Sequence, residues 1–272
     1  MKKIKYFVLL FLLCFLFIAS SCNKEELFEY SHITLVNYLD DSKSYSGIQI
    51  KEIKDKSIYD IIIPEEINGE KVVSIGDYAF SNCFKLKSIY IPETVKEIGK
   101  EAFSTDINLE KITLPNSVIS IGIDAFKNCN ALKCNEKDNG LYIGNDSNPY
   151  LCLLKIKENK NYFKIDDNCK FLLEGSFEDS QLDYLIINKS LIYVPDNAFG
   201  YKAQVHKIYY SGSEEEWNNF IDLIIKNHTN DNNNQIFSAT KYYYSINKDK
   251  ETKEGLYWYY DTDNKIVEKI NK

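Results

Sequence analysis

The chain has 272 residues, of which 44% are hydrophobic and 27% are charged, so it can bury a sizeable core. Its formal net charge is −7, and the sequence contains no arginine. An acidic chain without arginine lacks the positive surface that phosphate backbones require, which argues against nucleic-acid binding.

The N-terminus has the pattern of an export signal. Three lysines precede an unbroken apolar run over 6–18, which is too short to span a bilayer comfortably. Small residues at 19–21 then lead to Cys22, in an arrangement that resembles a bacterial lipobox. We expect a lipoprotein signal peptide over 1–21 and lipidation of Cys22. Simple secretion and a retained anchor remain the alternatives.

Residues 22–57 are expected to form a tether and an N-terminal cap. The tether is the polar, acidic stretch Asn23–Glu29. Cleavage of the signal peptide removes three lysines and no acidic residue, so the formal charge changes from −7 to −7 − 3 = −10. A lipid on Cys22 would anchor this acidic chain to the bacterial cell envelope.

A phrase recurs with a step of 23 residues through 58–133. Its three copies are Val72…Ile75-Gly76…Ala79-Phe80…Leu86, Val95…Ile98-Gly99…Ala102-Phe103…Leu109 and Val118…Ile121-Gly122…Ala125-Phe126…Leu132. A short apolar run that ends in proline precedes each copy, which is typical of a strand with one buried face that stops at the proline. One such coil cannot bury these side chains alone, so the coils must stack and share a core.

Two degenerate copies and an insertion follow. The copies lie in 163–212, at Phe163, Ile165, Cys169, Leu172, Ser176, Phe177 and Leu182, then at Leu185, Ile187, Leu191, Val194, Ala198, Phe199 and Val205. A sixth copy starts at 208–210. In the insertion, 134–162, two apolar runs flank a turn-rich stretch, which predicts a β-hairpin. The sequence therefore predicts a repeat solenoid of about five coils, each with one short strand and a mostly helical or irregular return segment.

The phrase Ile-x-Ile-Pro-x-x-Val-x-x-Ile-Gly-x-x-Ala-Phe-x-x-Cys-x-x-Leu resembles the BspA-type leucine-rich repeat family of bacterial surface proteins. The segments Asn139–Asn145 and Tyr209–Trp217 also resemble segments that accompany these repeats. The resemblance covers roughly residues 58 to 225. It implies a curved leucine-rich repeat solenoid that serves in adhesion or other protein contacts and has no shared catalytic site. The later units depart from the phrase, with Leu173 and Pro195 where earlier units have glycine.

The C-terminal part is expected to close the solenoid. A capping box at Ser213–Glu216 and apolar residues at helical spacing predict a capping helix over 213–226. Its Trp217 is either a core residue or an aromatic platform for a ligand. We expect a linker over 227–235 and a small antiparallel β meander over 236–272, whose aromatic residues form either a contact patch or a small core.

The acidic, cysteine and histidine residues predict no metal or cofactor site. The cluster Asp261–Asn264 lacks the glycine and distal glutamate of a calcium loop, so we expect a hairpin turn there. The sequence has no Cys-x-x-Cys, and its histidines are scattered. Cys83 and Cys129 hold the same repeat position two coils apart, about 9.6 Å at the spacing of strands. This exceeds the Cα limit of about 7 Å for a disulfide, so we expect a buried ladder of free thiols.

The outward side chains of the strands should line one face of the solenoid. The candidate contact residues on it are Asp60, Ile62, Ser88, Tyr90, Lys111, Thr113, Tyr184 and Ile186. Exposed apolar residues in adjacent rows mark partner sites, although β-propensity alone also selects them.

The sequence therefore favours a non-catalytic lipoprotein, anchored to the cell envelope and exposed at the cell surface, that binds a protein or glycan and no small-molecule substrate. The alternative is an envelope scaffold that holds another envelope protein through the C-terminal meander. An enzyme is the third hypothesis, and no catalytic motif supports it.

Overall fold

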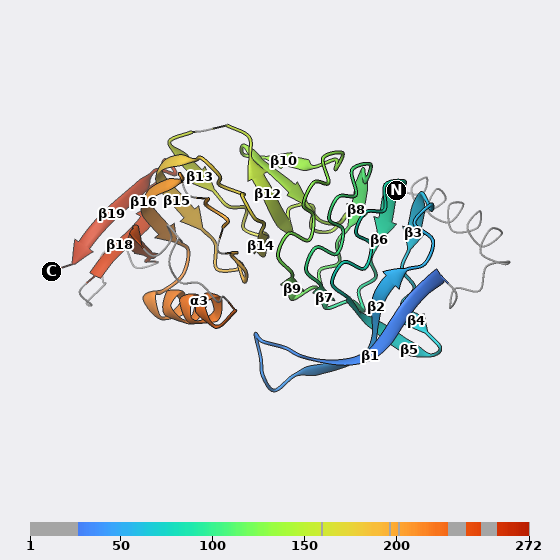
Figure 1. Cartoon of the computed structure of the whole chain (residues 1–272). Helices are drawn as coiled ribbons and strands as arrows, with labels where there is room; N and C mark the ends of the chain where they lie inside the picture. Colours follow the sequence, from blue (N-terminus) through green and yellow to red (C-terminus); the bar gives the residue numbers. More distant parts are fainter. Residues whose placement is uncertain are drawn as a thin grey trace, which may run out of the picture. The chain divides into compact units, whose positions relative to one another are not determined.

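The computed structural model describes residues 27–158, 160–195, 197–200, 202–227, 238–245 and 255–271 (Figure 1). The predicted signal peptide, Cys22 and most of the predicted linker lie outside these residues. The chain divides into two compact units. The N-terminal unit comprises the described residues up to Lys111 together with Ser120–Ala131, and the C-terminal unit comprises Ile112–Ile119 and the described residues from Leu132 onward.

The described elements are almost all strands. They are β1 (Phe28–Val36), β2 (Ser44–Ile53), β3 (Asp60–Ile62), β4 (Glu66–Ile67), β5 (Glu70–Ile75), β6 (Ser88–Tyr90), β7 (Glu97–Ile98), β8 (Lys111–Thr113), β9 (Ser120–Ile121), β10 (Asn135–Lys137), β11 (Gly140–Ile143), β12 (Cys152–Ile156), β13 (Tyr162–Lys164), β14 (Phe171–Leu172), β15 (Gln181–Ile187), β16 (Gln204–Tyr210), α3 (Glu214–Asn227), β17 (Thr240–Tyr244), β18 (Gly255–Tyr260) and β19 (Ile266–Asn271).

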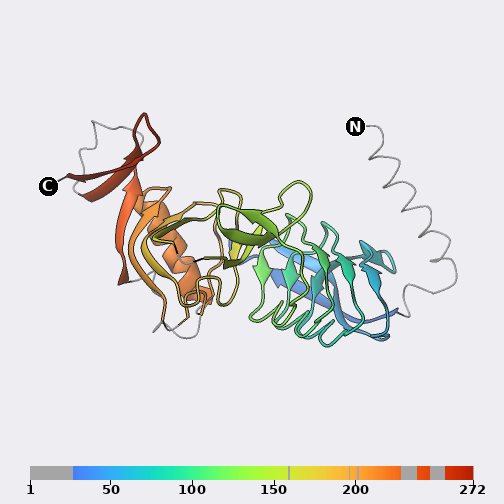
Figure 2. The same cartoon turned by 90° about the horizontal axis from the view of Figure 1, so that it is seen from above.

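The repeats of the N-terminal unit form stacked coils, as the 23-residue step predicts, and their short strands stand side by side (Figure 2). The strands β3 and β6 pair in parallel, and β5, β7 and β9 form a second parallel array in which Ile75, Ile98 and Ile121 are in register. The expectation of one strand per coil needs correction, because the return segment holds this second strand. A strand as short as β7 shows no alternating pattern, and the spacing from Val95 to Ile98 also fits a helix.

The phenylalanine of each phrase forms a continuous stack in this unit. The rings of Phe80 and Phe103 are 5.3 Å apart and those of Phe103 and Phe126 are 5.5 Å apart, with nearly parallel planes. The glycine of the phrase permits this close stacking of coils. A Cβ on Gly99 would lie 2.5 Å from the backbone nitrogen of Asp77 in the coil before it, a distance that only glycine avoids.

The N-terminal cap is a β-hairpin. The strand β1 pairs antiparallel with β2, and β2 pairs in parallel with β5, so the hairpin extends the sheet of the coils. Phe28 is buried and meets the ring of Phe80 edge to face at 6.2 Å. The predicted tether Asn23–Glu29 is therefore wrong for its last two residues, which belong to β1. The sequence pattern missed them because one buried aromatic residue within a polar stretch is a weak signal.

The inserted segment confirms the predicted hairpin and adds a strand to it. The strands β11 and β12 pair antiparallel, and β10 pairs antiparallel with β11 on the other side. The strand β12 also pairs in parallel with β14. The insertion is thus joined to the coils by backbone hydrogen bonds.

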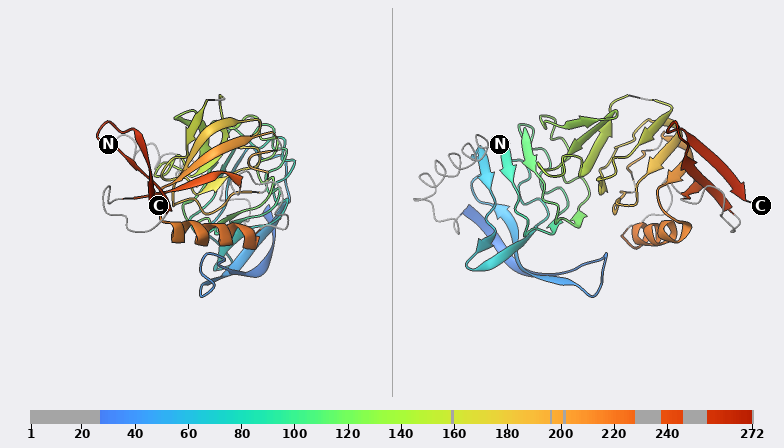
Figure 3. Two further views of the ribbon diagram at one scale, coloured as in Figure 1. Left: turned by 90° about the vertical axis from the view of Figure 1, so that its left-hand side faces the viewer. Right: turned by 180° about the vertical axis from the view of Figure 1, so that it is seen from behind.

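The C-terminal unit continues the coils through a sheet with the order β13-β15-β16-β17-β18-β19. The helix α3 lies beside the strands of this unit in both views of Figure 3, and its Trp217 and Phe220 are buried in the core of the coils. The predicted capping box is confirmed. The Glu216 amide donates to the Ser213 hydroxyl at 3.1 Å, and the Ser213 amide donates to the Glu216 carboxylate at 2.8 Å.

Two expectations for the C-terminal unit need correction. The helix α3 does not end the solenoid, because β17 follows it and pairs in parallel with β16, so α3 is the return segment of one more coil. The predicted meander is antiparallel only between β18 and β19, since β18 pairs in parallel with β17. The sequence could not decide this, because long connections permit a parallel pairing as well as an antiparallel one. The turn Asp261–Asn264 joins β18 to β19 as predicted.

Candidate partner-binding surface

The outward face of β3 and β6 in the N-terminal unit is open. Ile62 and Tyr90 are directly paired across the two strands and are 51% and 45% exposed. Their neighbours Ile61 and Ile89 point inward and are buried. The strand period therefore places an aliphatic and an aromatic side chain next to each other on the surface, as expected.

The polar candidates Asp60, Ser88 and Lys111 are the first residues of β3, β6 and β8. Ser88 is paired with Asp60, and its hydroxyl donates a hydrogen bond to the Asp60 carboxylate. Lys111 is exposed at the start of β8, where its amide donates to the carbonyl of Lys87 at 3.0 Å. Thr113, which belongs to the C-terminal unit, is half-buried.

Further exposed apolar residues of the N-terminal unit were not among the candidates. Tyr59, directly before β3, is exposed, and the Lys87 ammonium lies 5.9 Å from the centre of its ring. Phe84 and Ile107 are exposed in equivalent turns that precede β6 and β8. These two residues share one repeat position, so the 23-residue step itself could have identified them.

The outward face of the C-terminal unit is covered. Ile186 is only 4% exposed, so the expectation that it is a surface residue is wrong. It belongs to a buried cluster with Tyr209, Tyr242 and Trp258, against which Tyr184 and Ile266 pack. Trp258 comes from β18, and its indole nitrogen donates to the carbonyl of Tyr210 at 2.8 Å. The cover is supplied by strands that follow Ile186 at a long distance in the sequence, which no local pattern reveals.

The strands β18 and β19 form the cover over this face, and a carboxylate of β19 holds the cover in place. The Glu268 carboxylate accepts hydrogen bonds from the Lys207 ammonium at 2.7 Å and from the Tyr209 hydroxyl. Burial opposes ionisation of Glu268, but the hydrogen bonds from Lys207 and Tyr209 outweigh it and hold the pKa of Glu268 below its ordinary value. Burial together with this carboxylate raises the pKa of Tyr209.

Tyrosines continue along the strands at the open end of the same face. The rings of Tyr162 and Tyr184 stack at 5.0 Å, and Tyr184 meets Tyr209 edge to face at 5.3 Å. Tyr162 is exposed and Tyr184 is half-buried. Of the two candidates on β15, Tyr184 retains surface that a partner can reach and Ile186 does not.

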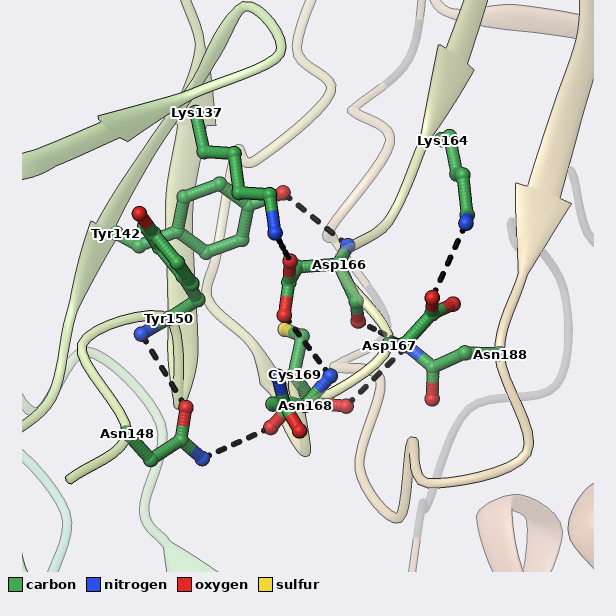
Figure 4. A network of polar contacts seen from close by, with 10 residues as sticks. All are labelled: Lys137, Tyr142, Asn148, Tyr150, Lys164, Asp166, Asp167, Asn168, Cys169 and Asn188. Carbon is green, nitrogen blue, oxygen red and sulfur yellow. Dashed lines mark hydrogen bonds and ion pairs between the residues drawn. The ribbon is translucent and has the colours of Figure 1, made fainter.

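A polar network holds the inserted segment to the coils. Figure 4 shows Lys137 of β10 reaching the carboxylate of Asp166, at 2.5 Å. The carboxylate also accepts the Asn168 amide at 2.9 Å, and the side-chain amide of Asn188 donates to the Asp166 carbonyl at 2.5 Å. Asp166 is almost completely buried, so a charge on its carboxylate needs the Lys137 ammonium and the Asn168 amide. The insertion is therefore a fixed part of its unit.

The comparisons with known proteins agree with this architecture. The model of the BspA type leucine rich repeat region matches residues 46–169 and 156–249, with six copies. The chain belongs to the BspA-type leucine-rich repeat family. The resemblance of the repeat phrase is thereby confirmed. A search of curated proteins found no match.

Solved structures similar to this BspA-type chain are leucine-rich repeat proteins. The leucine-rich repeat protein of T. pallidum is 20% identical, with 68% of this chain and 69% of that chain covered and a TM-score of 0.40. A leucine-rich repeat protein from Bacteroides ovatus is 22% identical, with 67% and 48% covered and a TM-score of 0.35. The pneumococcal vaccine antigen PcpA is 22% identical, with 53% and 44% covered and a TM-score of 0.26. This chain thus spans about half of the latter two.

The BspA-type phrase also explains the buried cysteines. Cys83 and Cys129 are buried, free thiols, as expected, and the coil between them places Asp106 at the same position. The Asp106 carboxylate accepts the Cys83 amide at 2.7 Å, while its second oxygen is buried without a hydrogen-bond partner. Burial raises the pKa of Asp106 to about 7.

The part of the chain that the structure describes has neither a cluster of metal-ligating side chains nor a membrane-spanning helix. Among those residues, three or more His, Cys, Asp or Glu side chains nowhere gather as they would around a metal ion. Over the same residues, no helix combines the length and apolar character needed to cross a membrane.

Proposed function

We propose that this chain is an exported, lipid-anchored, non-catalytic protein that binds a protein or glycan through the outward strand face of its N-terminal unit. The observation that carries the proposal is the exposure of Ile62 and Tyr90, paired side by side on that face. Burying such a pair in an interface would remove both from water, and aromatic residues give large contact area at low entropy cost. Asp60, Ser88 and Lys111 supply polar groups at the starts of the same strands.

Membership of the BspA-type family supports an interaction role. Most residues of the repeated phrase are buried and pack the core of the coils. The outward residues of the strands are not part of the phrase, so they are free to vary with a partner. The proposed location comes from the sequence of the N-terminus, in which lysines, an apolar run and small residues precede Cys22. Only a short segment then separates Cys22 from β1.

Location is tested by adding protease to intact cells, with disrupted cells as the control. We expect the wild-type protein to be cleaved on intact cells and the Cys22→Ala variant to appear in the medium. Cleavage only after disruption would contradict the surface location. Release of wild type and Cys22→Ala alike would contradict the lipid anchor.

Partner binding is tested with the double variant Ile62→Ala and Tyr90→Ala in a screen of matrix proteins and glycans. The matched control is Ile123→Ala with Tyr78→Ala, which removes the same two residue types at similarly exposed positions of the same unit. We expect affinity to fall at least tenfold in the first variant and to stay unchanged in the control. Equal affinity in both folded variants would remove this face from consideration.

The envelope-scaffold alternative has less support. It requires the aromatic residues of the C-terminal strands to be available to another protein, whereas Trp258, Tyr242 and Tyr257 are buried within the unit. The exposed large apolar residues of these strands are Tyr244 and Ile270. We therefore propose no second function for them.

A further inference from the structure

Over the described residues, the outer edge of β1 is a long strand edge without a paired strand. In the sheet order β1-β2-β5-β7-β9, β1 is the terminal strand, and among the described residues it pairs only with β2 (Figure 1). A terminal strand presents unpaired backbone N–H and C=O groups that attract another strand. Soluble proteins usually block such edges with lysine, proline, short length or a bulge in the strand.

The strand β1 lacks most of these blocking features. Its nine residues, FEYSHITLV, include neither lysine nor proline. Its one register shift lies between Glu29 and Tyr30, at its beginning, so Tyr30–Val36 is a regular strand. The other long terminal strand, β19, carries Glu268 and Lys269 in its middle. Of these two long terminal strands, β1 is thus the one without a lysine.

We propose that two copies of this chain pair through β1 in an antiparallel, two-fold symmetric arrangement. Such pairing consumes both edges and leaves none open, so it closes at the dimer. Two-fold symmetry requires that one residue of β1 is paired with the same residue of the second copy. If the regular segment Tyr30–Val36 overlaps fully, that residue is Ile33.

The side chains of Tyr30–Val36 are complementary in this register. Tyr30 faces Val36 of the second copy, which forms an aromatic and β-branched pair, a favourable combination across strands. Val36 is 63% exposed in one copy, so this pairing covers an apolar side chain that is otherwise in water. His32 faces Thr34, Ser31 faces Leu35, and no acidic residue faces another. The mixed apolar and hydroxyl side chains of β1 are therefore complementary to those of β1 in a second copy.

The test measures the mass of the chain from Asn23 onward by sedimentation over a range of concentrations. We expect the mass to approach twice that of one chain as concentration rises, with a micromolar or weaker dissociation constant, since the interface is small. The variant Ile33→Lys places two lysines opposite each other and should stay monomeric. It should fold, because a half-buried edge position lets the lysine reach water.

Two controls keep the result specific to β1. Ser46→Lys adds the same charge on β2, one strand away from the edge, and should dimerise like wild type. Under mild oxidation Ile33→Cys should form a covalent dimer, because directly paired residues lie within disulfide range. Ser46→Cys should not, since about three strand spacings, roughly 14 Å, would separate the two copies.

Three results would overturn the proposal. They are a wild-type chain that is monomeric at every concentration, a dimer that persists in Ile33→Lys, and equal cross-linking of Ile33→Cys and Ser46→Cys. A monomeric chain would leave the β1 edge to a strand from a different protein.

Discussion

The outward strand faces of the two units differ in their exposure to water. In the N-terminal unit Ile62 projects from β3 into water, whereas in the C-terminal unit Ile186 projects from β15 into a cluster completed by Trp258. Both isoleucines occupy the same position of a repeat strand. The difference arises because β18 and β19 fold over the second face, and it means that only the first has a large apolar area available to a partner.

The two units also differ in how they accommodate a buried carboxylate. The Asp166 carboxylate of the C-terminal unit is paired with the Lys137 ammonium and accepts a hydrogen bond from the Asn168 backbone amide. Asp106 of the N-terminal unit has one amide partner and one oxygen without any. A buried charge without partners costs free energy, so ionised Asp106 carries an electrostatic cost that Asp166 avoids.

The comparison between the two outward faces predicts the largest change in the free energy of unfolding. Ile186→Ala should lower the free energy of unfolding by about 2–5 kcal/mol, because it removes a buried side chain and leaves a cavity. Ile62→Ala should change it by less than about 0.5 kcal/mol, because that side chain is already in water. Hydrogen exchange, which resolves the two units, measures both. Equal losses in the two variants would mean that the two faces are covered alike.

The comparison between the carboxylates predicts a dependence on pH. The pKa of Asp106 is about 7 in the folded chain against an ordinary 3.8, so between these values the folded state holds more protons than the unfolded state. The contribution of Asp106 to stability is therefore greatest below about pH 4 and is lost as pH rises through 7.

The variant Asp106→Cys restores the residue of the neighbouring coils and removes this titration. It should be about 2–4 kcal/mol more stable than wild type at pH 8 and show no such gain at pH 4. Asp106→Asn keeps an acceptor for the Cys83 amide and should lose the same pH dependence. The measurement is chemical denaturation across this range. A pH slope that is identical in wild type and both variants would refute the assignment to Asp106.

The sequence predicted those features that depend on residues close together in the chain, and it missed those that depend on residues far apart. The period of 23 residues revealed the coils because each buried position repeats, and Phe80, Phe103 and Phe126 stack as a result. The sequence could not distinguish Ile62 from Ile186, because the cover over Ile186 comes from a distant strand. It also missed β7, which is too short to show a period, and the unpaired oxygen of Asp106, which depends on atomic contacts.

A third prediction concerns the paired carboxylate. Asp166→Ala should destabilise the C-terminal unit by about 2 kcal/mol, since Lys137 and the Asn168 amide lose their acceptor. The matched control is Asp167→Ala in the same turn, whose exposed pair with Lys164 at 3.1 Å should contribute less than about 0.5 kcal/mol. Thermal unfolding measures both. If the two variants lose equal stability, the buried network does not fasten the insertion.

The smallest expected effect belongs to the carboxylate that holds the cover over Ile186. Glu268→Gln should cost about 1 kcal/mol at neutral pH, because the contact with Lys207 is partly exposed and screened by solvent. The pKa of Glu268 is below its ordinary 4.5, so its contribution is present above that value and is lost as pH falls through the folded pKa.

This direction is opposite to that of Asp106, so acid should loosen the C-terminal cover while it stabilises the N-terminal coils. Hydrogen exchange of β18 and β19 at neutral and acidic pH measures the first effect. The control is Glu136→Gln, whose exposed pair with Lys157 belongs to the inserted segment and not to the cluster around Trp258. If Glu268→Gln behaves like this control at every pH, then aromatic packing around Trp258 alone holds the cover in place, and the two faces differ only in their apolar contacts.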